Sequence, residues 1–287
     1  MTRILSPTIM DGIACYSVGT ATAYDDYPDI GFDLTDANAE KSFWVRSRNR
    51  LFGWLVRREV ARLCEARLLD VGCGTGDFMR ELSGTRGLSL TGSEIYLAGL
   101  RFARKRLPSL DFVQYDVTEG SLDLKFDIIT AFDVLEHVER DLDGMRNIRA
   151  MLSENGVFIL SVPQHAFLWS TLDELVHHKR RYSRSLMLEK LRDAGFQPVR
   201  VTSYVFTLFP LMLLSRLFDK VNRRRTDRAH DGQNADAGQE IESRVVFSAP
   251  INWMFDRIMR IDELLVRLGL SLPFGGTLVV VARRDDS

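Results

Sequence analysis

The sequence predicts a doubly wound α/β fold, in which a mostly parallel seven-stranded sheet is covered by helices on both faces. From residue 67 onward, short apolar segments alternate with amphipathic ones, and the first apolar segment ends in a turn that contains Gly72, Gly74 and Gly76. Strands that alternate with helices imply right-handed crossover connections and therefore a parallel sheet. We also expect N-terminal helices before this core and a helical insertion before the last strand.

Residues 1–66 are predicted to cover the ligand cleft of the core. Roughly the first 35 residues read as irregular, because residues 24–29 are rich in turn-forming types. From about residue 36 to residue 67, large apolar side chains recur at three- and four-residue spacings, which indicates helices. These helices are expected either to form part of a lid or to cover one face of the sheet.

The core is expected at residues 67–206, and the final strand and tail at residues 273–287. The predicted strands are at residues 67–71, 88–94, 110–115, 126–132, 156–162, 198–205 and 277–282. The predicted helices between them are at residues 77–82, 95–107, 142–152 and 185–194, the last of which is closed by Gly195.

The insertion is expected at residues 207–272, where about seventy residues separate the last two strands. It contains two predicted helices, at residues 208–221 and 250–268, and a polar loop at residues 226–243 that we expect to be mobile. The first helix is apolar almost all round but too short to span a bilayer, and arginines follow it. Two interpretations stay open: contact with a membrane surface through residues 208–228, or a helical pair packed on the domain or on a second subunit.

Composition narrows the class of protein. The chain has 287 residues, of which 45% are apolar and 27% charged, and its net charge of −1 gives no reason to expect a nucleic-acid partner. The three cysteines show no C-x-x-C spacing, so no metal site is expected and a reduced, cytoplasmic setting is favoured. No signal peptide is evident. The predicted location is cytoplasmic or peripheral at the inner face of a membrane.

The glycine turn indicates a nucleotide-type ligand of a particular kind. Its third glycine comes one residue too early for the G-x-G-x-x-G fingerprint of dinucleotide binders. Asp70 stands just before the turn, where a carboxylate would repel a pyrophosphate. A ligand with a cationic end therefore fits this corner better.

The segment from Asp70 to Gly76 resembles the first motif of the Rossmann-fold S-adenosylmethionine-dependent methyltransferases. This resemblance implies S-adenosylmethionine as cofactor, with Gly72, Gly74 and Gly76 beneath its methionine and ribose. Asp70 is then expected to face the amino group of the cofactor.

Further acids follow the next strands, at the sheet edge where open α/β sheets bind ligands. Glu94, 18 residues beyond Gly76, is predicted to hold the ribose diol. Asp116 is predicted to accept from the adenine amino group, with the backbone of Val117 beside it, and Asp133 is also counted as cofactor-binding. Any one of these acids could instead be a loop residue or a helix cap.

The segment from Asp133 to His137 follows the fourth strand, where members of the family place residues that face the substrate. His137 is a candidate catalytic base, since an imidazole can accept a proton from a substrate hydroxyl near neutral pH. The alternative is a histidine packed at a strand–helix corner.

After the fifth strand, residues 162–170 contain the sequences V-P-Q-H and L-W-S, Asp173 follows, and residues 178–182 read H-K-R-R-Y. This pattern resembles that of a bacterial methyltransferase subgroup associated with saccharide, lipid and quinone pathways. Leu172 departs from the pattern of that subgroup, which commonly has histidine there. His178 is predicted as a second candidate base. Arg180 and Arg181 are predicted to hold the substrate, and the alternative for this pair is a solvated or helix-capping role. The predicted substrate-binding residues are His165, Trp169, Arg180, Arg181 and Tyr182.

Together these features predict an S-adenosylmethionine-dependent methyltransferase. Its acceptor is expected to be small or lipid-linked, of saccharide, lipid or quinone type, and methylated on oxygen. The alternatives are a non-catalytic scaffold or membrane-associated partner protein that binds S-adenosylmethionine, and a nicotinamide dehydrogenase, which the glycine spacing disfavours. The sequence makes no prediction of oligomeric state.

Overall fold

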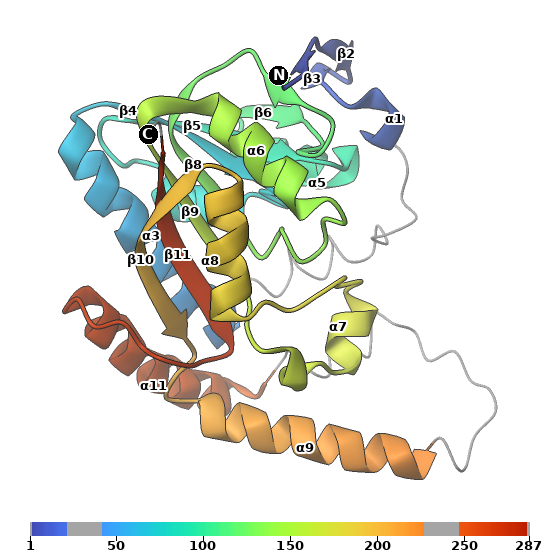
Figure 1. Ribbon diagram of the computed structural model, residues 1–287, viewed down its shortest axis with the longest axis vertical. Coiled ribbons are helices and arrows are strands. Elements are labelled where there is room, and N and C mark those ends of the chain that lie inside the picture. Colours follow the sequence, from blue (N-terminus) through green and yellow to red (C-terminus); the bar gives the residue numbers. More distant parts are fainter. Residues whose placement is uncertain (1, 22–41, 227–246, 286–287) are drawn as a thin grey trace.

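A computed structural model of the protein describes residues 2–21, 42–226 and 247–285 (Figure 1). Its main sheet has nine strands in the order β10-β11-β9-β8-β4-β5-β6-β3-β2. All seven predicted strands are present, and β11 is antiparallel to both of its neighbours, whereas β9, β8, β4, β5 and β6 run parallel. Their bounds are β4 Ala66–Val71, β5 Leu88–Glu94, β6 Asp111–Gln114, β8 Phe126–Phe132, β9 Leu152–Pro163, β10 Phe196–Tyr204 and β11 Thr277–Arg284.

The predicted count of seven strands was wrong, because the N-terminal residues extend the sheet. Strands β2 (Thr8–Met10) and β3 (Ile13–Cys15) form a hairpin whose β3 pairs with β6. The hairpin turns at Asp11 and Gly12, which both have positive φ, as the tightest hairpin turns require. The rest of this segment adds strand β1 (Ile4–Leu5), which pairs with β7 (Ser121–Leu122), and helix α1 (Val18–Ala21). The turn-rich stretch at residues 24–29 lies outside the described residues.

Helices cover both faces of the sheet, which confirms the doubly wound architecture. In Figure 1, α6 and α8 lie in front of the sheet and α3 lies behind it. The strands between them are buried on both sides, as the unbroken burial of residues 156–163 in β9 illustrates. One face packs against α3 Phe43–Leu63, α4 Asp77–Leu82, α5 Leu97–Arg106 and α11 Ala249–Arg267, and the other against α6 Asp141–Met151 and α8 Arg184–Asp193.

The insertion forms α9 (Phe209–Thr226) and α11, close to the predicted positions. Helix α11 packs on α3 of its own domain: Arg50 of α3 donates to Asp256 at 2.9 Å and to Glu263 at 2.5 Å. Of the polar loop predicted at residues 226–243, all but the first residue lies outside the described residues. In the described ranges, no helix combines the length and apolar character that crossing a bilayer requires.

Two short helices that were not predicted lie between β9 and α8. They are η1 (Ala166–Leu168) and α7 (Thr171–Leu175). Helix α7 begins with a capping box, in which the Ser170 side chain caps the backbone of the first turn and Asp173 caps the backbone of Ser170 in return.

Candidate functional site

A cavity of about 670 Å³ opens at the carboxyl ends of β4, β5, β6 and β8. This is the edge at which open α/β sheets bind ligands, and the volume suits a ligand of cofactor size. The cavity brings together most of the predicted cofactor residues and one predicted base. These residues are Asp70, Gly72, Gly74, Glu94, Asp116, Val117, Asp133 and His137.

The three glycines of the turn all have positive φ, but each has different surroundings. A Cβ on Gly72 would lie 2.5 Å from Cγ2 of Val134, so this position must be bare for the turn to approach the segment after β8. A Cβ on Gly74 would meet nothing within 4 Å, which leaves open space above the backbone. Gly76 does not line the cavity; a Cβ added there would lie 3.4 Å from Cβ of Ala103 on α5.

Glu94 ties the end of β5 to the glycine turn. Its carboxylate accepts from the backbone N–H of Gly74 at 3.0 Å and of Ile95 at 2.8 Å. Burial raises the pKa of Glu94 above its ordinary value, although these hydrogen bonds act in the opposite direction. Glu94 thus fixes the turn and also faces the cavity, so its predicted contact with a ribose diol stays a prediction with compatible geometry.

Asp70 is a buried acid at the cavity wall. Its carboxylate accepts from Oγ1 of Thr130 at 2.6 Å. Burial raises the pKa of Asp70 to about 7, against the opposing effects of the Thr130 hydroxyl and the Arg48 guanidinium. An acid in this state near neutral pH ionises readily when a cationic ligand group binds beside it.

Asp116 and Val117 lie where β6 ends. Oδ1 of Asp116 accepts from the backbone N–H and the hydroxyl of Thr118, at 2.8 and 2.7 Å, so this oxygen shapes the loop itself. The carbonyl of Val117 accepts from the Asn147 side chain at 2.7 Å. Both residues line the cavity, and their predicted contacts with adenine stay predictions.

Arg48, on α3, is a cavity residue that the sequence reasoning missed. Its Nη1 donates to Oδ2 of Asp133 at 2.9 Å, while Ser161 donates to Oδ1 of the same carboxylate at 2.8 Å. Nε of Arg48 is buried and has no hydrogen-bond partner in the described part of the chain. The available signal was an arginine on the same helical stripe as Leu51, Phe52 and Leu55.

His137 lines the cavity, and His178 stands behind it. The two rings are edge to face with centroids 4.8 Å apart. Burial, and next the neighbouring His178, lower the pKa of His137 to about 4, so this imidazole is neutral at physiological pH. Nδ1 of His178 lies 2.9 Å from Oδ1 of Asp173, which favours the proton on Nδ1 and leaves Nε2 as an acceptor.

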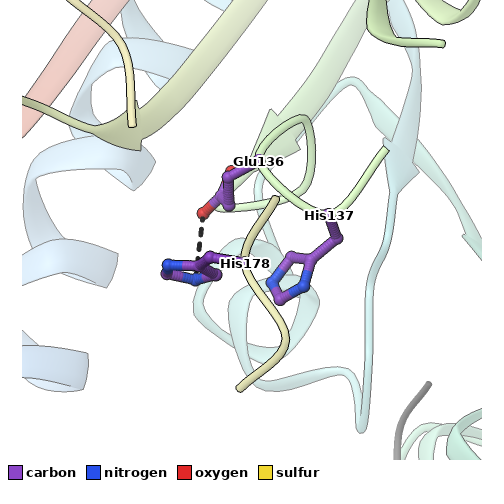
Figure 2. A group of neighbouring side chains, drawn as sticks. All are labelled: Glu136, His137 and His178. Carbon is purple, nitrogen blue, oxygen red and sulfur yellow. Dashed lines mark ion pairs between the residues drawn. The ribbon is translucent and has the colours of Figure 1, made fainter. Parts of the chain in front are cut away.

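Figure 2 shows Glu136, His137 and His178 gathered together, with the Glu136 carboxylate 3.8 Å from Nε2 of His178. Glu136 is fully buried, and neither of its oxygens has a hydrogen-bond partner among the described residues. Burial, and next the Asp133 carboxylate, raise its pKa well above the ordinary value. One candidate ligand atom from each of the three residues lies within 4.8 Å of the others, so the group could hold a metal ion. The sequence-based expectation of no metal site did not consider this group.

Two predicted substrate residues, Arg181 and Tyr182, bond to acids of the protein itself. Arg181 is 7% exposed and donates twice to Asp173, at 2.7 and 3.1 Å. These bonds, with that of His178, lower the pKa of Asp173 despite its burial. Tyr182 has no exposed surface, and its hydroxyl donates to Asp141 at 2.8 Å. These contacts give both side chains a structural role, and their contact with a substrate stays a prediction.

The other three predicted substrate residues do not line the cavity. Arg180 pairs with Asp141 at 3.3 Å, and Trp169 donates to Glu174 at 3.2 Å. His165 has its ring 4.9 Å from that of Phe167, in a stacked arrangement. Their contact with a substrate stays a prediction. Two neighbours that the sequence reasoning overlooked, His177 and Lys179, do line the cavity.

Comparison with known proteins adds family information to this geometry. Residues 37–201 match the family model described as methyltransferase domain. A ubiquinone biosynthesis O-methyltransferase of Histophilus somni is 32% identical over 122 residues, which is 39% of this chain and 51% of that relative. A probable S-adenosylmethionine-dependent methyltransferase of Mycobacterium tuberculosis is 23% identical over 225 residues, 77% of this chain and 72% of that one. The chain thus spans about half the length of the first relative.

Among solved structures, the fold is similar to phosphoethanolamine N-methyltransferase 2 from Haemonchus contortus in complex with S-adenosyl-L-methionine. The TM-score is 0.55 at 16% sequence identity, and the match covers 91% of this chain and 58% of that one. At this identity the likeness establishes the fold alone.

Proposed function

The chain belongs to the methyltransferase domain family, and we propose that it transfers the methyl group of S-adenosylmethionine to a hydroxyl oxygen of a small or lipid-linked acceptor. One observation carries the proposal. The cavity at the strand ends is bounded by the glycine turn, by Glu94 at the end of β5 and Asp116 after β6, and by a neutral histidine.

The residues present fit S-adenosylmethionine. The open space above Gly74 gives room for a ligand directly on the backbone. Asp70 would hold the cationic amino group, and Glu94 and Asp116 would hold the ribose and the adenine. Arg48, with its unpartnered buried Nε, would hold the cofactor carboxylate. The bound cofactor supplies a methyl group on a sulfonium sulfur. This methyl group is transferred by in-line displacement when the acceptor is correctly positioned.

His137 is the leading candidate base, because it faces the cavity in its neutral form. It would accept the proton of the acceptor hydroxyl at a ring nitrogen as the new bond to carbon forms. His178 is the second candidate, since Asp173 holds its ring and leaves Nε2 able to accept. His178 does not line the cavity, so it would act on the acceptor only if the loop between α7 and α8 moved.

A quinone-type acceptor is proposed ahead of a saccharide or another lipid. The Histophilus somni relative, whose name states ubiquinone biosynthesis and O-methylation, supports this choice. A phenolic hydroxyl is also more acidic than a sugar hydroxyl, which matters because the lowered pKa of His137, about 4, makes this imidazole a weak base. The subgroup that the second motif resembles is consistent with the same acceptor class.

The test is turnover with S-adenosylmethionine and a panel of catechol, sugar and lipid-linked acceptors. We expect formation of S-adenosylhomocysteine together with a phenolic product heavier by one methyl group. His137→Gln should lower kcat by about 10²- to 10⁴-fold while cofactor binding is retained. A larger loss in His178→Gln than in His137→Gln would assign the base to His178.

The alternative function is a non-catalytic scaffold that binds S-adenosylmethionine. Tight cofactor binding with no product from any acceptor in the panel would favour it. The neutral histidine in the cavity wall argues against it, because a scaffold has no need of a base beside the ligand. Membership of the methyltransferase family argues against a nicotinamide dehydrogenase.

A further inference from the structure

Helix α9 leaves a stripe of apolar side chains uncovered. Leu211, Leu214, Leu217 and Phe218 are between 49% and 67% exposed. They recur every three or four residues, so they lie along one side of the helix. A continuous exposed apolar surface of this kind marks an interaction site in a soluble domain.

Helix α11 has the same character on its outer side. Its inner side packs into the core against α3. On the outer side, Trp253, Ile261, Leu264 and Leu268 are between 50% and 70% exposed. The domain therefore covers one face of α11 and leaves large apolar side chains of the opposite face in contact with solvent.

The charges on α11 are sorted by sign. Its acids, Asp256, Asp262 and Glu263, are all buried. Its exposed charges are all arginines, and the guanidinium of one of them, Arg257, lies 5.5 Å from the ring centroid of Trp253. The other exposed arginines of this helix are Arg260 and Arg267. This surface is therefore apolar and cationic.

The two helices adjoin each other and the loop that follows β9. Asp262 of α11 accepts from the backbone N–H groups of Phe206 and Thr207, just before α9 begins. The ring of Phe209, at the start of α9, lies 5.8 Å from that of His165. Figure 1 shows both helices at the lower end of the molecule, with α9 below α7 and α11 at the lower left. The exposed surface thus extends to the loop that carries His165.

We propose that α9 and α11 dock together on the surface of an anionic lipid bilayer. Apolar side chains would enter the headgroup region while the arginines meet lipid phosphates, which is how interfacial helices bind. The charges favour lipid over a second copy of this chain. A two-fold interface would place this surface against itself and bring exposed arginines together. Asp256 and Glu263 lie 3.5 and 3.9 Å from Arg260 and Arg267, but both acids are buried on the inner side of α11 and would not reach across such an interface.

Docking of this kind would deliver a lipid-linked acceptor beside the catalytic domain. It does not rest on the proposed methyl transfer, because vesicle binding is measured with neither cofactor nor acceptor present. Failure of one proposal is therefore distinguishable from failure of the other.

The experiment is co-sedimentation of the full chain with phosphatidylcholine vesicles, with and without phosphatidylglycerol. We expect pelleting with the anionic vesicles that weakens as salt increases. The double variants Leu214→Ser/Leu217→Ser and Arg257→Ser/Arg260→Ser should each bind at least about tenfold more weakly. The control is Val199→Ser, which removes an apolar side chain of similar exposure, 51%, from β10. It should pellet like the unmodified chain.

Two results would overturn the proposal. The first is that the unmodified chain pellets equally with anionic and neutral vesicles, or that both double variants pellet with anionic vesicles as well as the control does. The second is a dimer in sedimentation velocity that the leucine variant dissociates, without any vesicle binding, which would assign the surface to a second copy. The arginine variant changes only exposed side chains, so it keeps the test decisive if the leucine variant does not fold.

Discussion

Arg48 and Asp133 join the long N-terminal helix to the end of β8, through a bond of 2.9 Å between Nη1 and Oδ2. The two side chains are 20% and 25% exposed, and both lie in the wall of the cavity. Because Ser161 holds the other carboxylate oxygen, Asp133 is fixed from two sides and in turn fixes the guanidinium. The pair therefore presents a positioned cation to any ligand in the cavity.

Replacing Arg48 should weaken cofactor binding. We expect Arg48→Gln to raise the Kd for S-adenosylhomocysteine by about 10- to 100-fold, since hydrogen bonds to charged groups contribute about 1.5–3 kcal/mol. Isothermal titration calorimetry measures the change. The matched control is Arg62→Gln, on the same helix, whose partner Glu59 is three residues away and whose side chain is 52% exposed. Equal affinities for both variants would show that Arg48 does not contact the cofactor.

The pKa of Asp70 predicts that cofactor binding depends on pH. Its pKa is about 7 in the free protein, and a bound cation favours the ionised form. Binding should therefore expel a proton below pH 7, and affinity should be about tenfold lower at pH 6 than at pH 8. Calorimetry in buffers of different ionisation enthalpy measures the proton released. Asp70→Asn should bind more weakly and lose this pH dependence, whereas an unchanged dependence would assign the proton to another group.

The same group predicts the pH dependence of stability. A folded pKa above the unfolded value means that the folded state holds the proton more tightly. The contribution of Asp70 to the free energy of unfolding is therefore complete below about pH 4 and is lost as the pH rises through 7. Thermal unfolding should be measured for the unmodified chain and for Asp70→Asn between pH 5 and 8. The stability advantage of the unmodified chain over Asp70→Asn should shrink or reverse as the pH rises. A constant advantage would contradict the raised pKa.

Local patterns predicted the fold well and the contacts across it poorly. The central strands were predictable because each is a continuous apolar run that is buried on both faces. The hairpin at residues 8–15 escaped because its strands have three residues each, although Asp11 and Gly12 carried a turn signal. The contact from Arg48 spans 85 residues, and no local pattern encodes such a distance.

A run of charged residues does not show which of its members is exposed to solvent. Arg180 and Arg181 look alike in sequence, but only Arg181 is buried, because Asp173 lies opposite it. Whether an arginine is solvated or buried depends on a partner from another segment. The glycine turn and the acids after the strands were predictable, because strand ends gather at one edge whatever the loops do.

Arg181 should therefore matter for stability. Removing one member of a buried ion pair leaves the other charge uncompensated, which costs about 3–5 kcal/mol. We expect Arg181→Ala to lower the free energy of unfolding by about 3 kcal/mol in urea titrations, because Asp173 also keeps its bond to His178. The control is Arg140→Ala, whose side chain is 62% exposed and which should change stability little. Normal stability with a raised KM in Arg181→Ala would support the predicted contact with substrate instead.

Gly72 and Gly74 should respond differently to the same substitution. Both have positive φ, of 71° and 53°, so alanine costs about 1–2 kcal/mol of backbone strain at either position. At Gly72 the new methyl group would also collide with Val134, at 2.5 Å, which adds about 1–3 kcal/mol. Gly72→Ala should therefore be the less stable variant in urea titrations, and Val134→Ala should restore part of the loss.

At Gly74 the methyl group would enter the open space of the cavity. Gly74→Ala should fold but bind S-adenosylhomocysteine at least about tenfold more weakly, because the cofactor needs that bare backbone. Unchanged affinity in Gly74→Ala would show that the ligand does not approach the turn there, and equal stability of the two variants would contradict the collision with Val134.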